Sequence, residues 1–180
     1  MDSDGYLSQL ADIFNGITVN TPSISAIIAI ALAGVLLLAS GFASASEIAF
    51  FSLSPSDRND IDERNHPSDD KISALLGDTE RLLATILITN NFVNVTIIML
   101  CNFFFMNVFV FHSPLAEFLI LTVILTFLLL LFGEIMPKIY SAQKTLAFCR
   151  FSAPGIYFLE KVFRPIATVL VRSTTFLNKH

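Results

Sequence analysis

Polar residues with oxygen-bearing side chains interrupt three otherwise apolar stretches of the chain. Two serines stand four residues apart in the first stretch, and two asparagines have the same spacing in the second, so each pair shares one helix face. The third stretch ends in Gly-Glu-Ile-Met-Pro-Lys. Hydroxyl, amide, carbonyl and carboxylate oxygens suit Mg²⁺, Ca²⁺ or Na⁺ rather than Zn²⁺ or Cu. The candidate metal ligands are Ser40, Ser44, Asn90, Asn94, Gly133 and Glu134.

The proline in the third polar stretch is expected to expose a backbone oxygen. Pro137 has no N–H and clashes with the carbonyl of the residue four positions earlier, which is Gly133. We therefore predict a helix break that frees this carbonyl as a ligand, with Glu134 supplying a negative charge beside it. The alternative is a helix that ends at the interface, with Glu134 paired to Lys138 at the favourable i,i+4 spacing.

Structural explanations also exist for the other two polar stretches. Serine, glycine and alanine permit close packing of helices, and asparagine can hold two helices together in a membrane. Asn91 lies between the two candidate asparagines, and one asparagine would suffice for adhesion. The density of asparagines therefore favours a functional site, in which Asn91 and Glu47 are weaker candidates.

The three apolar stretches, 24–51, 82–111 and 115–132, are the elements that must position these residues. Each approaches or exceeds the ~20 residues that a membrane-spanning helix needs. Hydrophobic residues make up 54% of the 180-residue chain and charged residues 14%, which argues against a soluble domain. A net charge of −4 argues against a nucleic-acid partner. We predict an all-α integral membrane protein whose main partner is the lipid bilayer.

Charge predicts the orientation of the chain. All 11 Lys and Arg residues fall within 58–81 and 138–179. The positive-inside rule places both segments in the cytoplasm, which requires three crossings and an external N-terminus in the inner (plasma) membrane. We predict three parts: an extracytoplasmic segment 1–22, a three-span domain 23–147 with a cytoplasmic helical insertion 54–81, and juxtamembrane amphipathic helices 148–180.

Shorter signals mark the remaining elements. Ser54 and Pro55 are typical of a helix start, a second short helix follows Pro67 and ends at Leu76, and Asp78 caps the next helix. We expect a short interfacial helix over 6–17, a tight hairpin at 112–114, and no cleavable signal peptide, because the first 21 residues are polar and acidic.

The tail combines a polar face, carrying basic residues, with a broad apolar surface, which favours a helical belt lying on the membrane. Pro154 and Pro165 are predicted to break or kink it. The alternative is a helix packed beneath a soluble domain. Cys101 and Cys149 are interpreted as free, buried thiols. The polar face comprises Lys161, Arg164, Thr168, Arg172, Thr175 and Lys179.

Three motifs, at 44–54, 83–94 and 133–138, together resemble the transmembrane domain of the CNNM/CorC family, also called DUF21 or cyclin-M-like. The resemblance covers about residues 23–172. It implies a homodimer with three spans, a helical insertion and a juxtamembrane belt, associated with Na⁺-dependent Mg²⁺ efflux. Matched by motif, the transported Mg²⁺ would be held by the six candidate ligands named above, with Na⁺ as coupling ion. It also implies a downstream CBS-domain pair, which these 180 residues do not contain.

Three functional hypotheses follow. The leading one is the transmembrane domain of a Mg²⁺ transporter that holds a largely dehydrated ion among its three spans. The second is a non-transporting scaffold or sensor of an envelope or gliding-type machine, with a structural or regulatory ion site. The third, an intramembrane enzyme, is disfavoured because the spans contain no Ser-His, His-Glu-x-x-His or paired-aspartate arrangement.

Overall fold

The protein is an all-α membrane domain, as the sequence predicts. A computed structural model describes residues 17–111 and 113–177. Within them, three helices are long and apolar enough to cross a membrane: α2 (Ile24–Phe51), α5 (Thr79–Val108) and a third over Glu117–Gln143. The interfacial helix predicted over 6–17 lies, except for its last residue, outside the described part of the chain.

The third span is one continuous helix of three parts. It consists of α6 (Pro114–Leu128), a π-helical turn η1 (Leu129–Ile135) and α7 (Met136–Gln143). The predicted helix break at Pro137 is therefore wrong. The π turn explains the difference, because its hydrogen bonds join residues five apart, as in the bond from the Met136 N–H to the Leu131 carbonyl. A proline entering just after such a turn needs no break in the helix.

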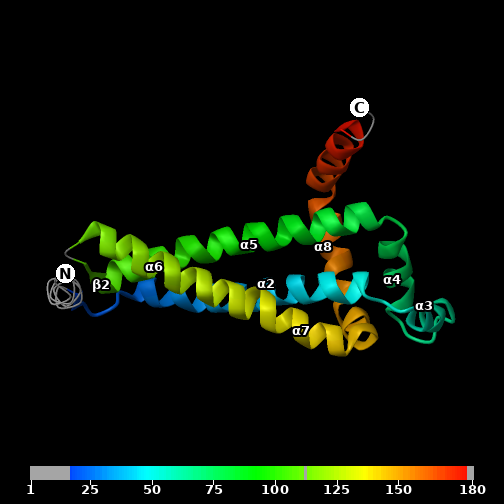
Figure 1. Cartoon of the computed structure of the whole chain (residues 1–180), viewed down its shortest axis with the longest axis horizontal. Coiled ribbons are helices and arrows are strands. Elements are labelled where there is room, and N and C mark those ends of the chain that lie inside the picture. Colours follow the sequence, from blue (N-terminus) through cyan, green and yellow to red (C-terminus); the bar gives the residue numbers. More distant parts are fainter. Residues whose placement is uncertain (1–16, 112, 178–180) are drawn as a thin grey trace, which may run out of the picture.

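The three spans lie side by side, and the two ends of the bundle carry different elements (Figure 1). One end holds a two-stranded antiparallel ribbon of β1 (Thr18–Val19) and β2 (Phe109–Val110). Helix α5 therefore stops at Val108, short of the predicted end at 111, because the β-favouring residues that follow pair with β1. The other end holds α3, α4, α7 and α8, so the two basic segments are gathered at one end.

The insertion forms the two short helices that its capping residues predict, α3 (Pro55–Asp62) and α4 (Asp69–Leu76). Ser54 and Asp57 make a reciprocal capping box at the start of α3. Asp78 caps α5, since its Oδ1 accepts a hydrogen bond of 3.1 Å from the Arg81 N–H. These local bonds fix where each helix begins and hence how the chain turns back into the membrane.

Helix α8 (Thr145–Leu177) runs across the end of the bundle, at a steep angle to the three spans (Figure 1). The prediction that its two prolines break it is wrong, because both lie inside one helix. Cys149, Ala153 and Ile156 are completely buried on its first half, so packing holds the helix together across Pro154. Cys149 is a free thiol, as predicted, and burial raises its pKa to about 12.

Two buried clusters form the core. The first joins α2, α3, α4, α5 and α8 at the basic end and includes Phe50, Ile72 and Ile156. The second lies within the spans, where Ala33 and Val93 bring α2 and α5 together against the third helix. Most large side chains on the outer surfaces of the spans are apolar and exposed, as lipid contact requires.

Candidate metal site

A polar junction between α2 and α5 brings together the serines and asparagines singled out by the sequence. The Ser40 Oγ lies 2.9 Å from the Asn90 Oδ1 and 2.6 Å from the Asn94 Oδ1. The Ser44 Oγ lies 3.4 Å from the same Asn90 oxygen. Both serines are completely buried, so this junction is a polar island within apolar helices.

The local sequence explains why these side chains meet. Four-residue spacing places both serines on one face of α2 and both asparagines on one face of α5, and the two faces oppose each other. Gly41 and its small neighbours let the third span approach α2, since a Cβ on Gly41 would lie 3.0 Å from the Pro137 Cγ.

Gly133 brings the backbone of the π turn against the same junction. A Cβ at this position would lie 3.1 Å from the Ser40 Oγ, so any larger residue would press on the hydroxyl. Gly133 is buried. Three helices thus meet at Ser40. Helices α2 and α5 contribute side chains, and the third span contributes its backbone.

Glu134 does not join the cluster in this conformation. Its side chain is half-buried, and within 17–111 and 113–177 no hydrogen bond or ion pair engages its carboxylate. The Glu134–Lys138 pair weighed as an alternative does not form. Lys138 turns instead to α2, where its Nζ lies 3.2 Å from the Glu47 Oε2. The carboxylate next to the junction therefore remains available to a cation.

The weaker candidates lie outside the junction. Asn91 is exposed, and Glu47 is occupied by Lys138. Sequence reasoning missed the π turn and the bond in which the buried Ser141 hydroxyl donates to the Ala45 carbonyl at 2.6 Å, fixing α7 to α2. Pro137 was the one available signal, because a proline deep in a helix requires an altered hydrogen-bond pattern nearby.

Four side-chain oxygens, two hydroxyl and two amide, face one another at the junction. The Ser40 hydroxyl has one hydrogen and faces both amide oxygens, so when it donates to Asn94 the longer bond from Ser44 remains for Asn90. Such a convergence of oxygens favours a positive charge. No group of three or more His, Cys, Asp or Glu side chains that could hold a metal occurs in the part of the chain that the structure describes.

The fold and the junction define a three-span membrane domain with an oxygen-lined polar centre. The sequence profile of the cyclin M transmembrane N-terminal domain, CNNM, matches residues 30–180, and the chain belongs to that family.

Two curated relatives also align with the chain. It is 26% identical over 140 residues to a UPF0053 protein of Synechocystis sp., covering 78% of this chain and 39% of the relative. It is 29% identical over 136 residues to a UPF0053 protein of Haemophilus influenzae, covering 76% of this chain and 31% of the relative. The chain thus matches less than two fifths of either relative.

Proposed function

We propose that this chain is the membrane domain of a Mg²⁺ transporter, driving Na⁺-dependent Mg²⁺ efflux. The observation that carries the proposal is the meeting of four side-chain oxygens from α2 and α5 beside Gly133 in the π turn. Membership of the CNNM family is consistent with this function. The transported ion would be held by Ser40, Ser44, Asn90, Asn94, Gly133 and Glu134.

The ligand set favours weak, reversible binding of a hard cation. Hydroxyl and amide oxygens replace part of the hydration shell of Mg²⁺ but supply no charge. Glu134 is the one carboxylate in the set, so a divalent ion would keep a net positive charge in the site. A carrier needs such an incomplete balance, because it must release its cargo on the far side of the membrane.

Lys138 is the competing cation. It lies four residues after Glu134, a spacing at which an ion pair forms readily on a helix. The contact with Glu47 holds its ammonium group elsewhere. We infer that Glu47 keeps the Glu134 carboxylate free for Mg²⁺, and that Na⁺ drives transport by competing for the same oxygens.

The contact between Gly41 and Pro137 is where the spans would move. Gly41 offers no side chain to interlock with α7, and the π turn lies directly before Pro137. Small residues let membrane helices approach closely, and π turns are frequent at functional sites. A rocking motion about this contact would open the junction first to one side of the membrane and then to the other.

The test is ion flux through proteoliposomes that contain an encapsulated Mg²⁺-sensitive dye. We expect wild-type flux that depends on a Na⁺ gradient and falls at least tenfold in Glu134→Gln. Glu117→Gln is the matched control, because Glu117 begins the same span at its other end. Mg²⁺ binding by calorimetry without any flux would overturn the transporter and leave the scaffold or sensor. Equal binding by wild type and Glu134→Gln would remove Glu134 from the site.

The same proposal fixes the orientation of the domain in the plasma membrane, with the basic end in the cytoplasm. Thr21, between β1 and α2, and Ser56, in α3, are both exposed. The β1–β2 ribbon and α3 lie at opposite ends of the bundle (Figure 1). A cysteine at Thr21 should react with a membrane-impermeant maleimide on intact cells, and a cysteine at Ser56 only after lysis. The reverse pattern would invert the topology.

A homodimer is the assembly we propose. Its support is the family resemblance and the extensive apolar surface of the spans. The Phe-rich end of α5 is partly engaged within the chain itself, because Phe105 lies 5.6 Å by ring centroids from both Phe104 and Phe109. Light scattering of the detergent-solubilised chain, corrected for bound detergent, should give twice the chain mass, and a monomer mass would refute it.

A further inference from the structure

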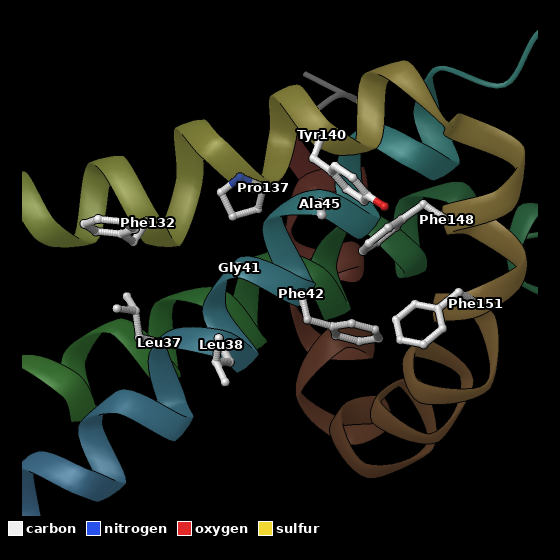
Figure 2. A pocket seen from close by; sticks show the side chains of 10 residues that line it. All are labelled: Leu37, Leu38, Gly41, Phe42, Ala45, Phe132, Pro137, Tyr140, Phe148 and Phe151. Carbon is white, nitrogen blue, oxygen red and sulfur yellow. The ribbon is translucent and has the colours of Figure 1, made fainter.

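An apolar groove opens beside the contact between Gly41 and Pro137. It has a volume of about 400 Å³ and lies between α2, the third span and α8. Figure 2 shows Leu37, Leu38 and Phe132 at one end and Phe148 and Phe151 at the other. Along α2 the lining runs from Leu37 to Ala45, about 12 Å at 1.5 Å of rise per residue. The groove is thus elongated along the direction of the spans.

A second hollow of about 270 Å³ shares lining residues with the basic end of the groove. Tyr140, Phe148 and Phe151 line both, and Lys144 joins them in the second. Lys144 is exposed and is the first residue beyond the third span, which ends at Gln143. A lysine at the end of a spanning helix suits the level of lipid headgroups.

Lys144 also differs from its basic neighbours in being unpaired. Lys138 is bound to Glu47, and Arg150 is bound to Asp69. Across 17–111 and 113–177, no hydrogen bond or ion pair engages the Lys144 ammonium group. A positive charge without a partner thus stands at the open end of an apolar slot.

We propose that this groove is a binding site for one anionic phospholipid. An acyl chain lies in the slot between α2 and the third span, and Lys144 pairs with the phosphate. The shape, the apolar lining and the position of the charge match an acyl chain with a negative headgroup. A second copy of this chain would have to present an acidic group at the same depth beside an apolar ridge, and no feature of the described residues favours that occupant.

Aromatic rings line the groove at its basic end. Tyr140 is exposed at the interface, where amphipathic rings are favoured. Phe148 lies within 6.5 Å, between ring centroids, of Tyr140, Phe42 and Phe151. The rings connect α7, α2 and α8, so a lipid bound here would contact α8, α2 and the third span at once.

Native mass spectrometry of the delipidated chain in detergent tests the proposal. Phosphatidylglycerol and phosphatidylcholine with identical acyl chains are titrated separately. We expect phosphatidylglycerol to bind about fivefold more tightly, the affinity equivalent of roughly 1 kcal/mol for one lysine near an anionic lipid. Lys144→Ala should bring the ratio of the two affinities close to one. Lys71→Ala, which removes an exposed lysine of α4 outside the groove, should leave the ratio unchanged.

A second variant tests the slot itself. Leu38 is 76% exposed, so Leu38→Trp fills the groove without disturbing the packed core. We expect it to weaken binding of both lipids while the melting temperature stays the same. The site is refuted if Lys144→Ala and Lys71→Ala behave alike, or if Leu38→Trp leaves lipid binding intact. Loss of dimer with unchanged lipid binding in Leu38→Trp would refute it too, because a second copy would then occupy the groove.

Discussion

Two polar junctions between helices in the described part of the chain are built in opposite ways. At the basic end, Asp69 of α4 is completely buried and receives two hydrogen bonds from Arg150 of α8, at 2.9 and 3.1 Å. The His66 N–H donates a third, at 2.9 Å. Within the spans, by contrast, one Ser40 hydroxyl faces two amide oxygens, and the nearby Glu134 carboxylate is unpaired in the described part of the chain.

The contrast separates a structural joint from a site. A buried charge that is fully bonded is expensive to disturb and offers nothing to a ligand. A junction of uncharged hydroxyl and amide groups keeps oxygen lone pairs that a cation can share. Charge alone therefore does not locate function, since the best-buried ion pair among the described residues, Asp69–Arg150, joins α4 to α8.

The largest expected effect comes from breaking the structural joint. Arg150→Met leaves the buried Asp69 carboxylate without its partner and should destabilise the fold by roughly 3–5 kcal/mol. Thermal unfolding in detergent measures this. Arg64→Met is the matched control, because the Arg64–Asp70 pair is 71% exposed on both sides and should contribute nothing measurable. The double variant Asp69→Asn/Arg150→Met should recover much of the loss, and a failure to recover would attribute the effect to lost packing.

Acid should loosen the same joint. Burial raises the pKa of Asp69, but the hydrogen bonds from Arg150 and His66 outweigh it and hold the pKa below the ordinary value of 3.8. The stabilisation is therefore complete above about pH 4 and is lost as the pH falls through the folded pKa. Melting curves between pH 7 and pH 3 should show this loss in wild type and a weaker one in the double variant. Parallel curves would contradict the assignment.

A smaller effect, on Mg²⁺ affinity, is expected when Lys138 loses its partner Glu47. Glu47→Gln releases Lys138, which should then pair with Glu134 and weaken Mg²⁺ binding about two- to fivefold, the range of a partly exposed ion pair. Calorimetric titration with Mg²⁺ measures it. Asp62→Asn removes an exposed acid of α3 and should have no effect. An unchanged affinity in Glu47→Gln would mean that Lys138 does not compete for the site.

The smallest effect on stability is expected in the junction itself. Asn90→Leu removes one of the two amide oxygens near Ser40 and should lower stability by only ~0.6 kcal/mol, the average for a hydrogen bond between membrane helices. Mg²⁺ binding should nevertheless be lost. Asn91→Leu, one residue away and exposed, should change neither property. A large loss of stability in Asn90→Leu would make the junction a structural joint like that of Asp69.

Local signals allowed the spans, the short helices and the four polar side chains of the junction to be predicted. The length of the apolar stretches predicted the spans, and capping residues such as Ser54 and Asp78 predicted where helices begin. The four-residue spacing predicted which polar side chains share a helix face. These properties depend on neighbours within a few positions. The prolines were misread, because propensity alone ignores the π turn before Pro137 and the packing that carries α8 through Pro154.

The sequence by itself determined that the chain crosses a membrane, where it turns, and which faces of α2 and α5 carry oxygen, because length, capping and periodicity are local. Only the tertiary structure decided which charges pair. Asp69 pairs with Arg150, which is 81 positions away in the sequence, and Lys138 pairs with Glu47 although Glu134 is closer in the sequence. Such choices depend on how separate helices pack, since an ion pair forms wherever the fold brings two charges together.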